Sequence, residues 1–127
     1  MLNEARKFTA LLAKLMGLKA EGNYTEFDHQ LSDILQKDYD TDLGNLLALS
    51  EIEFTKRIGS ATYNSEKLNA LSQLLYVFAE PFSANEEAKL LLKKVLAIFD
   101  LLEQKHHYES FENFDKRKTI YKYYEQQ

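Results

Sequence analysis

Two adjacent histidines, His106 and His107, are residues whose type could support chemistry, because imidazole nitrogens are common metal ligands. Neighbouring side chains on a helix point about 100° apart, so this pair does not readily share one ion. Glu103 and His107 are four residues apart, which is the spacing of metal-binding pairs on a helix. A role at the end of a helix is the favoured interpretation, and we predict no metal site.

A second polar cluster surrounds His29, with Glu26 three residues before it and Asp33 four residues after it. On a helix these intervals bring the side chains to one face, where they can form ion pairs or a ligand set. Acid–base catalysis would need a desolvated cleft around the carboxylates. The surrounding segment is acidic, so a solvated surface pair is the favoured interpretation.

Three aspartates, Asp38, Asp40 and Asp42, alternate as they do at the start of an EF-hand calcium loop. The sixth position of that loop requires glycine and the twelfth requires glutamate. Leu43 and Leu49 stand at these two positions, so the sequence does not favour calcium binding.

The end of the chain mixes cations with aromatic rings, a combination that can contact a nucleic-acid backbone and stack on its bases. Between Lys105 and Tyr124 there are five basic residues against three acidic ones. A terminal helix with one solvated basic face is the alternative, and the net charge of −4 favours it. The candidate partner-binding residues are Lys116, Arg117, Lys118, Tyr121, Lys122 and Tyr124.

Motifs that would indicate an enzyme are absent from the sequence. There is no glycine-rich phosphate loop, nucleophile elbow or zinc-protease motif. Cysteine is also absent, which excludes disulfides and cysteine-ligated metals and fits a reducing compartment. We therefore expect a protein that is not an enzyme and that needs no cofactor.

The composition is that of one globular domain over residues 1–127, with 45% hydrophobic and 28% charged residues. No apolar run approaches the roughly 20 residues that cross a bilayer. The basic and apolar residues of the first segment interleave, which favours an amphipathic helix over a targeting peptide. We expect a cytoplasmic protein that does not associate with membranes.

Apolar residues recur at three- and four-residue intervals along most of the chain, which predicts an all-α protein of about five to seven helices. One Pro and four Gly leave few breakers. The helix from Ala84 to Lys105 is apolar on nearly every side, so it is predicted to be the central element. The predicted helices cover residues 2–20, 24–37, 42–49, 50–59, 64–80, 84–105 and 108–124.

Helix starts and joints carry recognisable local signals. Ser50 with Glu53, and Ser83 with Glu86, match the capping box. Two phrases, EGNYTEF and KHHYESF, each join two predicted helices and place a Tyr three residues before a Phe.

A Tyr and a Phe at this spacing share a helix face. We therefore expect Tyr24 and Phe27 to pack the second helix against the first, and Tyr108 and Phe111 to do the same for the last helix. Gly22 and Asn23 should turn the chain, since both tolerate left-handed backbone.

The joint Gly22-Asn23-Tyr24 and the spacing from Asn85 to Ala88 resemble the tetratricopeptide repeat. In that family a helix ends in a Gly-Asp/Asn-Tyr turn, and a small residue follows three positions after the Tyr. In this chain the small position is Phe in two of the three joints.

The resemblance covers two helical hairpins, residues 2–37 and 64–105, with the last helix as a cap. The order of segments is also similar to uncharacterised bacterial proteins of tetratricopeptide-like fold. The resemblance implies stacked antiparallel hairpins in a right-handed superhelix, and it implies fold and not activity.

Stacked hairpins leave a groove that can take a peptide or a helix. The expected function is therefore protein–protein interaction, as an adaptor or a regulatory subunit. Nine acidic residues against the single Lys37, counted from Glu21 to Glu53, favour a basic partner. The alternatives are nucleic-acid association through the last helix, and pairing of two copies through its aromatic residues.

Overall fold

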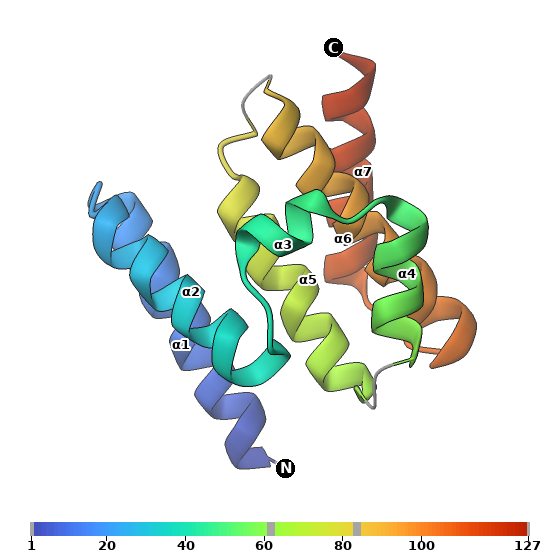
Figure 1. Ribbon diagram of the computed structural model, residues 1–127, viewed down its shortest axis with the longest axis horizontal. Helices are drawn as coiled ribbons and strands as arrows, with labels where there is room; N and C mark the ends of the chain where they lie inside the picture. The colour runs from blue at the N-terminus through green and yellow to red at the C-terminus, as the bar shows by residue number, and fades with distance from the viewer. Residues whose placement is uncertain (1, 61–62, 83–84, 127) are drawn as a thin grey trace. The chain divides into compact units, whose positions relative to one another are not determined.

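The computed structural model describes residues 2–60, 63–82 and 85–126, with side-chain environments from residue 7 onward. Every regular element in these ranges is an α-helix, so the all-α prediction is confirmed (Figure 1). Internal contacts divide the chain into two compact units, Met1–Ala48 and Leu49–Gln127. Each unit is described by itself below, and a single domain over the whole chain stays a prediction.

The first unit contains α1 (Leu2–Ala20), α2 (Tyr24–Tyr39) and α3 (Leu43–Ala48). Helices α1 and α2 pack along each other as an antiparallel hairpin (Figure 1). One side of α2 is buried, whereas most described side chains of α1 are at least partly exposed and only Leu15 is fully covered. The buried apolar residues of α2 are Phe27, Leu31, Ile34, Leu35 and Tyr39.

The joint of this hairpin turns at Gly22 as the sequence predicts, whereas Asn23 has a φ of −86° and is the N-cap of α2. Gly22 has a φ of 77°, and the Asn23 N–H donates to the Leu18 carbonyl at 2.9 Å. Phe27 is 2% exposed, as expected, but Tyr24 is 60% exposed. The prediction that Tyr24 packs against α1 is therefore wrong, because this first residue of α2 lies at the tip of the hairpin, where α1 has already ended.

The second unit contains α4 (Glu51–Ser60), α5 (Ser65–Ala79), α6 (Glu86–Lys105) and α7 (Phe111–Glu125). Helix α6 packs against the other three, so its predicted central place is confirmed within this unit (Figure 1). The described helices include none with the length and apolarity needed to cross a lipid bilayer. The buried side of α6 consists of Ala88, Leu91, Leu92, Lys94, Val95, Ile98, Phe99 and Leu102.

The predicted capping box at the start of α4 is present. The Ser50 N–H donates to Glu53 Oε1 at 3.1 Å, and the Glu53 N–H donates to Ser50 Oγ at 3.1 Å. The backbone hydrogen bond from Ser50 lowers the pKa of Glu53. At the start of α6 the capping residue is Asn85, which accepts from the Ala88 N–H at 2.8 Å, and the predicted cap Ser83 lies outside the described residues.

Helix α7 begins three residues later than the sequence predicts. His107 has a φ of 52°, and the Tyr108 N–H donates to the Leu102 carbonyl, which closes α6. Ser110 then caps α7, so Tyr108 and Phe111 do not share a helix face. Phe111 is 89% exposed, and the predicted packing of this pair is wrong because the second phrase is a helix end followed by a separate cap.

Candidate functional site

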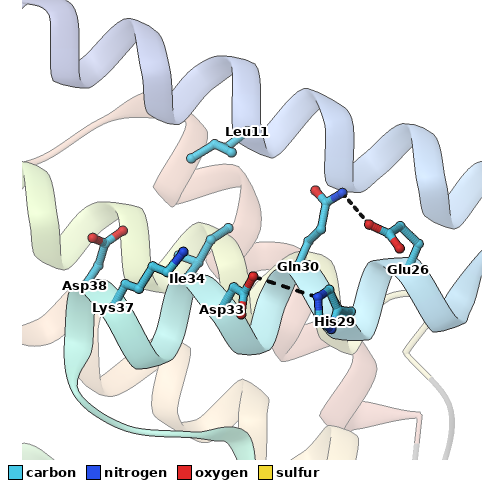
Figure 2. Close-up of a pocket in the computed structure, with 8 residues that line it drawn as sticks. All are labelled: Leu11, Glu26, His29, Gln30, Asp33, Ile34, Lys37 and Asp38. Carbon is cyan, nitrogen blue, oxygen red and sulfur yellow. Dashed lines mark hydrogen bonds and ion pairs between the residues drawn. The ribbon is translucent and has the colours of Figure 1, made fainter.

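A groove of about 420 Å³ runs along the hairpin of the first unit, open to solvent (Figure 2). Helix α1 contributes a single apolar side chain to it, and α2 contributes the rest over three of its turns. The lining residues are Leu11, Glu26, His29, Gln30, Asp33, Ile34, Lys37 and Asp38.

The apolar part of the groove comes from both helices. Leu11 points from α1 toward α2, and Ile34 points from α2 toward α1 (Figure 2). Ile34 is 9% exposed because it belongs to the buried row of α2, whereas Leu11 remains 37% exposed. The groove therefore has apolar surface that a ligand could cover.

The rim of the groove is polar and mainly acidic. The carboxylates of Glu26, Asp33 and Asp38 are exposed, and Lys37 is the cation among the lining residues. Gln30 Nε2 donates to Glu26 Oε1 at 2.9 Å, which holds that carboxylate along the helix.

His29 Nε2 lies 3.9 Å from Asp33 Oδ2, with side chains 70% and 54% exposed. This is the solvated surface pair that the sequence favours, and these exposed groups lack the desolvation that acid–base catalysis requires.

The aspartates that resemble a calcium loop are used at helix ends. Asp40 is the left-handed C-cap of α2, with a φ of 50°. Asp42 Oδ1 accepts from the Asn45 N–H at 2.7 Å at the start of α3. In the part of the chain that the structure describes, no three His, Asp or Glu side chains gather as a metal site.

The histidines at the end of α6 also lack a metal-binding geometry. Helix α6 ends at Lys105, so Glu103 and His107 are not one turn apart on a continuous helix. The Glu103 carboxylate instead accepts from Arg117 at 2.9 Å.

The candidate partner-binding residues of the last helix divide between two sides. Arg117 faces inward: its Nη2 lies 2.9 Å from both Asp100 and Glu103, and its guanidinium lies 5.5 Å from the Phe99 ring centroid. Burial alone would lower the pKa of Arg117, but hydrogen bonds with Asp100 and Tyr121, together with the charge of Glu103, raise it. Arg117 therefore stabilises the packing of α7 against α6.

Tyr124 and Lys116 also make contacts within the second unit. The Tyr124 hydroxyl donates to the Lys89 carbonyl at 2.6 Å, and burial raises the pKa of Tyr124 to about 12. Lys116 Nζ lies 5.2 Å from the centroid of the Tyr76 ring. These two residues, like Arg117, have intramolecular roles.

The other candidate residues of the last helix, Lys118, Tyr121 and Lys122, are exposed. Phe111 and Phe114 are also exposed on this helix, and for Phe111 this contradicts the packing that the sequence predicted. The cations that the sequence grouped together thus do not form one basic surface.

Sequence reasoning missed a polar cluster between α5 and α7. Gln73 Nε2 donates to Asn113 Oδ1 at 3.1 Å, and Asn113 Nδ2 donates to Asn69 Oδ1 at 2.9 Å. Ser72, Gln73 and Asn113 are buried. Among the described residues no buried side-chain nitrogen or oxygen lacks a partner, so this cluster joins helices and has no vacant polar group for a ligand.

A buried lysine is the second feature that sequence reasoning missed. Lys94 on α6 is 2% exposed, and its Nζ lies 5.8 Å from the centroid of the Phe54 ring on α4. Burial lowers the pKa of Lys94, and the nearby charge of Glu51 only partly opposes this. The sequence signal would have been its position inside the apolar row of α6.

A scan with protein-family models matches none of them to the chain. Searches against curated proteins and solved structures return no significant match. The functional interpretation therefore depends on the chain's own residues, among which those lining the groove of the first unit combine apolar surface with exposed carboxylates.

Proposed function

We propose that this chain is a cytoplasmic protein-interaction module of tetratricopeptide-like type, an adaptor or regulatory subunit whose α1–α2 groove binds a basic peptide or helix of another protein. The observation that carries the proposal is the combination of apolar surface from Leu11 and Ile34 with an exposed carboxylate rim. The antiparallel pairing of α1 with α2 supports a helical-hairpin type of module.

The size of the groove fits a short peptide. Its lining extends along α2 from Glu26 to Asp38, which is about 18 Å at the rise of an α-helix. This length matches about three turns of a bound helix. A volume of about 420 Å³ lies within the range of ligand pockets, at its smaller end.

The charge of the rim selects the chemistry of the partner. Glu26 and Asp33 are seven residues apart, so they lie on one face of α2 about two turns from each other. A helical partner with Lys or Arg at the same interval can face both carboxylates. Exposed ion pairs contribute only about 0–1 kcal/mol each, so they set partner choice and association rate, while apolar contact supplies most of the affinity.

A direct binding measurement tests the proposal. The probe is a fluorescent synthetic helical peptide with a leucine stripe and lysines seven residues apart, and its control has glutamate in place of each lysine. We expect the basic peptide to bind at least about tenfold more tightly, with the preference falling at high salt. Nuclear magnetic resonance shifts should concentrate on the residues that line the groove.

Matched variants locate the site. Asp33→Lys should weaken binding of the basic peptide, whereas Asp28→Lys changes an exposed carboxylate of α2 outside the groove and should not. Leu11→Ser should weaken binding of the basic peptide, whereas Met16→Ser alters an exposed residue of α1 outside the groove. Equal binding of the two peptides, or equal effects of each variant and its control, would refute the proposal.

A further inference from the structure

The outer face of α7 has a stripe of large exposed side chains. Phe111 is 89% exposed, Phe114 is 41% exposed and Tyr121 is 49% exposed. Lys118 is also exposed and lies between Phe114 and Tyr121. The intervals of three, four and three residues put these four side chains, defined here as the α7 stripe, on one face of the helix.

The opposite face of α7 packs against the other helices of the second unit, so the stripe is not part of the core of that unit. Asn113, Ile120 and Tyr123 are the buried residues of this helix. The ion pairs of Arg117 and the hydrogen bond of Tyr124 further hold the helix in place. The stripe is therefore presented on a fixed support, which reduces the entropy lost when a partner covers it.

We propose that a second copy of this chain covers the α7 stripe, with the two α7 helices antiparallel about a two-fold axis near residue 116. The order of residue types in the stripe is the reason. In this register Phe111 lies opposite the partner's Tyr121, and Phe114 lies opposite the partner's Lys118. Both pairs are centred on position 116, through which the two-fold axis passes. The contact thus consists of two aromatic pairs and two cation–aromatic pairs.

Charge also favours the antiparallel arrangement. A parallel pair would bring Lys118 against the partner's Lys118, which is a repulsive contact. In the antiparallel register Phe114 is opposite the partner's Lys118. Asp115, the exposed residue that follows Phe114, therefore also lies near that lysine. Each copy thus supplies a carboxylate near the lysine of the other.

The same charges argue against nucleic acid as the occupant of this face. The exposed cations Lys118 and Lys122 are accompanied by the exposed carboxylates Asp115 and Glu125, so the face has no net positive charge. Exposed aromatic residues of this density are typical of protein contacts. Three rings from each copy form a small interface, so we expect a reversible dimer rather than a permanent one.

Sedimentation velocity over a concentration series tests the pairing. We expect the wild-type chain to shift from monomer to dimer as its concentration rises toward about 1 mM. Phe111→Ser should move the midpoint to at least about tenfold higher concentration. Ile52→Ser is the matched control, because Ile52 is a 71% exposed apolar residue on α4 of the same unit, and it should leave the midpoint unchanged.

The absence of cysteine from the chain allows a direct test of the register. When Phe114→Cys chains are mixed with Lys118→Cys chains and oxidised, the mixed disulfide should form faster than either homodimeric one. Faster linkage of two Lys118→Cys chains would indicate parallel pairing and refute the register. A wild-type chain that stays monomeric to about 1 mM, or equal effects of Phe111→Ser and Ile52→Ser, would refute the dimer.

Discussion

The side-chain amide of Gln73 donates to the carboxamide oxygen of Asn113 at 3.1 Å, joining helices whose two residues are 40 positions apart in the sequence. Both side chains are buried, and Asn69 and Ser72 complete their hydrogen bonds. This cluster sets the position of α7 along α5, and hence which side of α7 faces solvent.

We predict that Asn113→Ala lowers the free energy of unfolding by about 1–3 kcal/mol, because it leaves the Gln73 amide without one of its buried partners. The double variant Gln73→Leu with Asn113→Leu should lose less stability than the sum of the two single variants. Urea denaturation of the wild type, Asn113→Ala, the double variant and its two single variants, Gln73→Leu and Asn113→Leu, measures these differences. Strict additivity would show that the two side chains do not interact.

We predict that Arg117→Met lowers the free energy of unfolding by about 1 kcal/mol, since it removes the ion pairs with Asp100 and Glu103. The loss is small because Asp100 is more than half exposed, and solvent weakens such pairs. Arg117→Lys should recover only part of the loss, because an ammonium cannot reproduce the geometry of the guanidinium. Lys118→Met, on the exposed side of α7, is the control and should be nearly neutral. Equal denaturation midpoints for the variants at positions 117 and 118 would contradict the inward role of Arg117.

Because of Tyr124, we predict that the protein loses stability in strong base. Its pKa is raised to about 12 from its ordinary value of 10.0, so above pH 10 the unfolded chain releases this proton before the folded chain does. Its contribution to stability is present below pH 10 and is lost as the pH rises through about 12. Tyr124→Phe should lack this component and lose about 1 kcal/mol at neutral pH, where the hydroxyl still donates to Lys89.

Thermal denaturation from pH 8 to 11 measures that difference. Tyr24→Phe is the control, because Tyr24 is 60% exposed. A pH profile of Tyr124→Phe that is parallel to the wild-type profile would contradict the assignment.

For Lys94 we predict that the free energy of unfolding changes with pH in the opposite direction. Burial lowers its pKa below the value in the unfolded chain, so the unfolded chain binds the extra proton and stability rises as the pH rises toward 10.5. Lys94→Met removes the buried amine and should raise the free energy of unfolding at pH 7 by roughly 0.5–2 kcal/mol. Lys93→Met changes the exposed neighbour and should have little effect. Destabilisation by Lys94→Met would show that the buried amine stabilises the fold.

In the first hairpin, we predict that truncating two aromatic residues three positions apart has very different effects on the free energy of unfolding. Phe27→Ala should lower the free energy of unfolding by about 3–5 kcal/mol, because Phe27 is 2% exposed and its ring lies 5.2 Å from Lys19 Nζ. Tyr24→Ala should change it by at most about 0.5 kcal/mol, because Tyr24 is 60% exposed. Circular dichroism during urea denaturation measures both, and similar losses would contradict the observed burial.

Local features of this protein were predictable because they depend on residues within one helical turn of each other. The turn at Gly22 and Asn23 and the capping box of Ser50 and Glu53 both involve contacts between near neighbours in the chain. The last helix shows the limit of such signals. Two joints with similar letters have different structures, because in the second one Ser110 caps a new helix after His107 has ended the previous one.

The candidate sites were less predictable than the helices. His29 and Asp33 could be paired from their spacing alone, and the structure has them 3.9 Å apart. The groove beside them needs Leu11 of α1 opposite Ile34 of α2, a pairing for which no local signal exists. Likewise, Arg117 was grouped with its basic neighbours, but its partners Asp100 and Glu103 belong to another helix.

The sequence by itself determined the helices, most of their ends and the central place of α6, because apolar periodicity and caps act over three or four residues. Only the tertiary structure decided that Phe111 and Tyr121 face solvent while Lys94 is buried. Helix α7 carries aromatic residues on both sides, so its own periodicity selects no buried face. That choice depends on Gln73 and the other α5 groups that bind α7, and such partners lie too far away in the chain for sequence patterns to identify them.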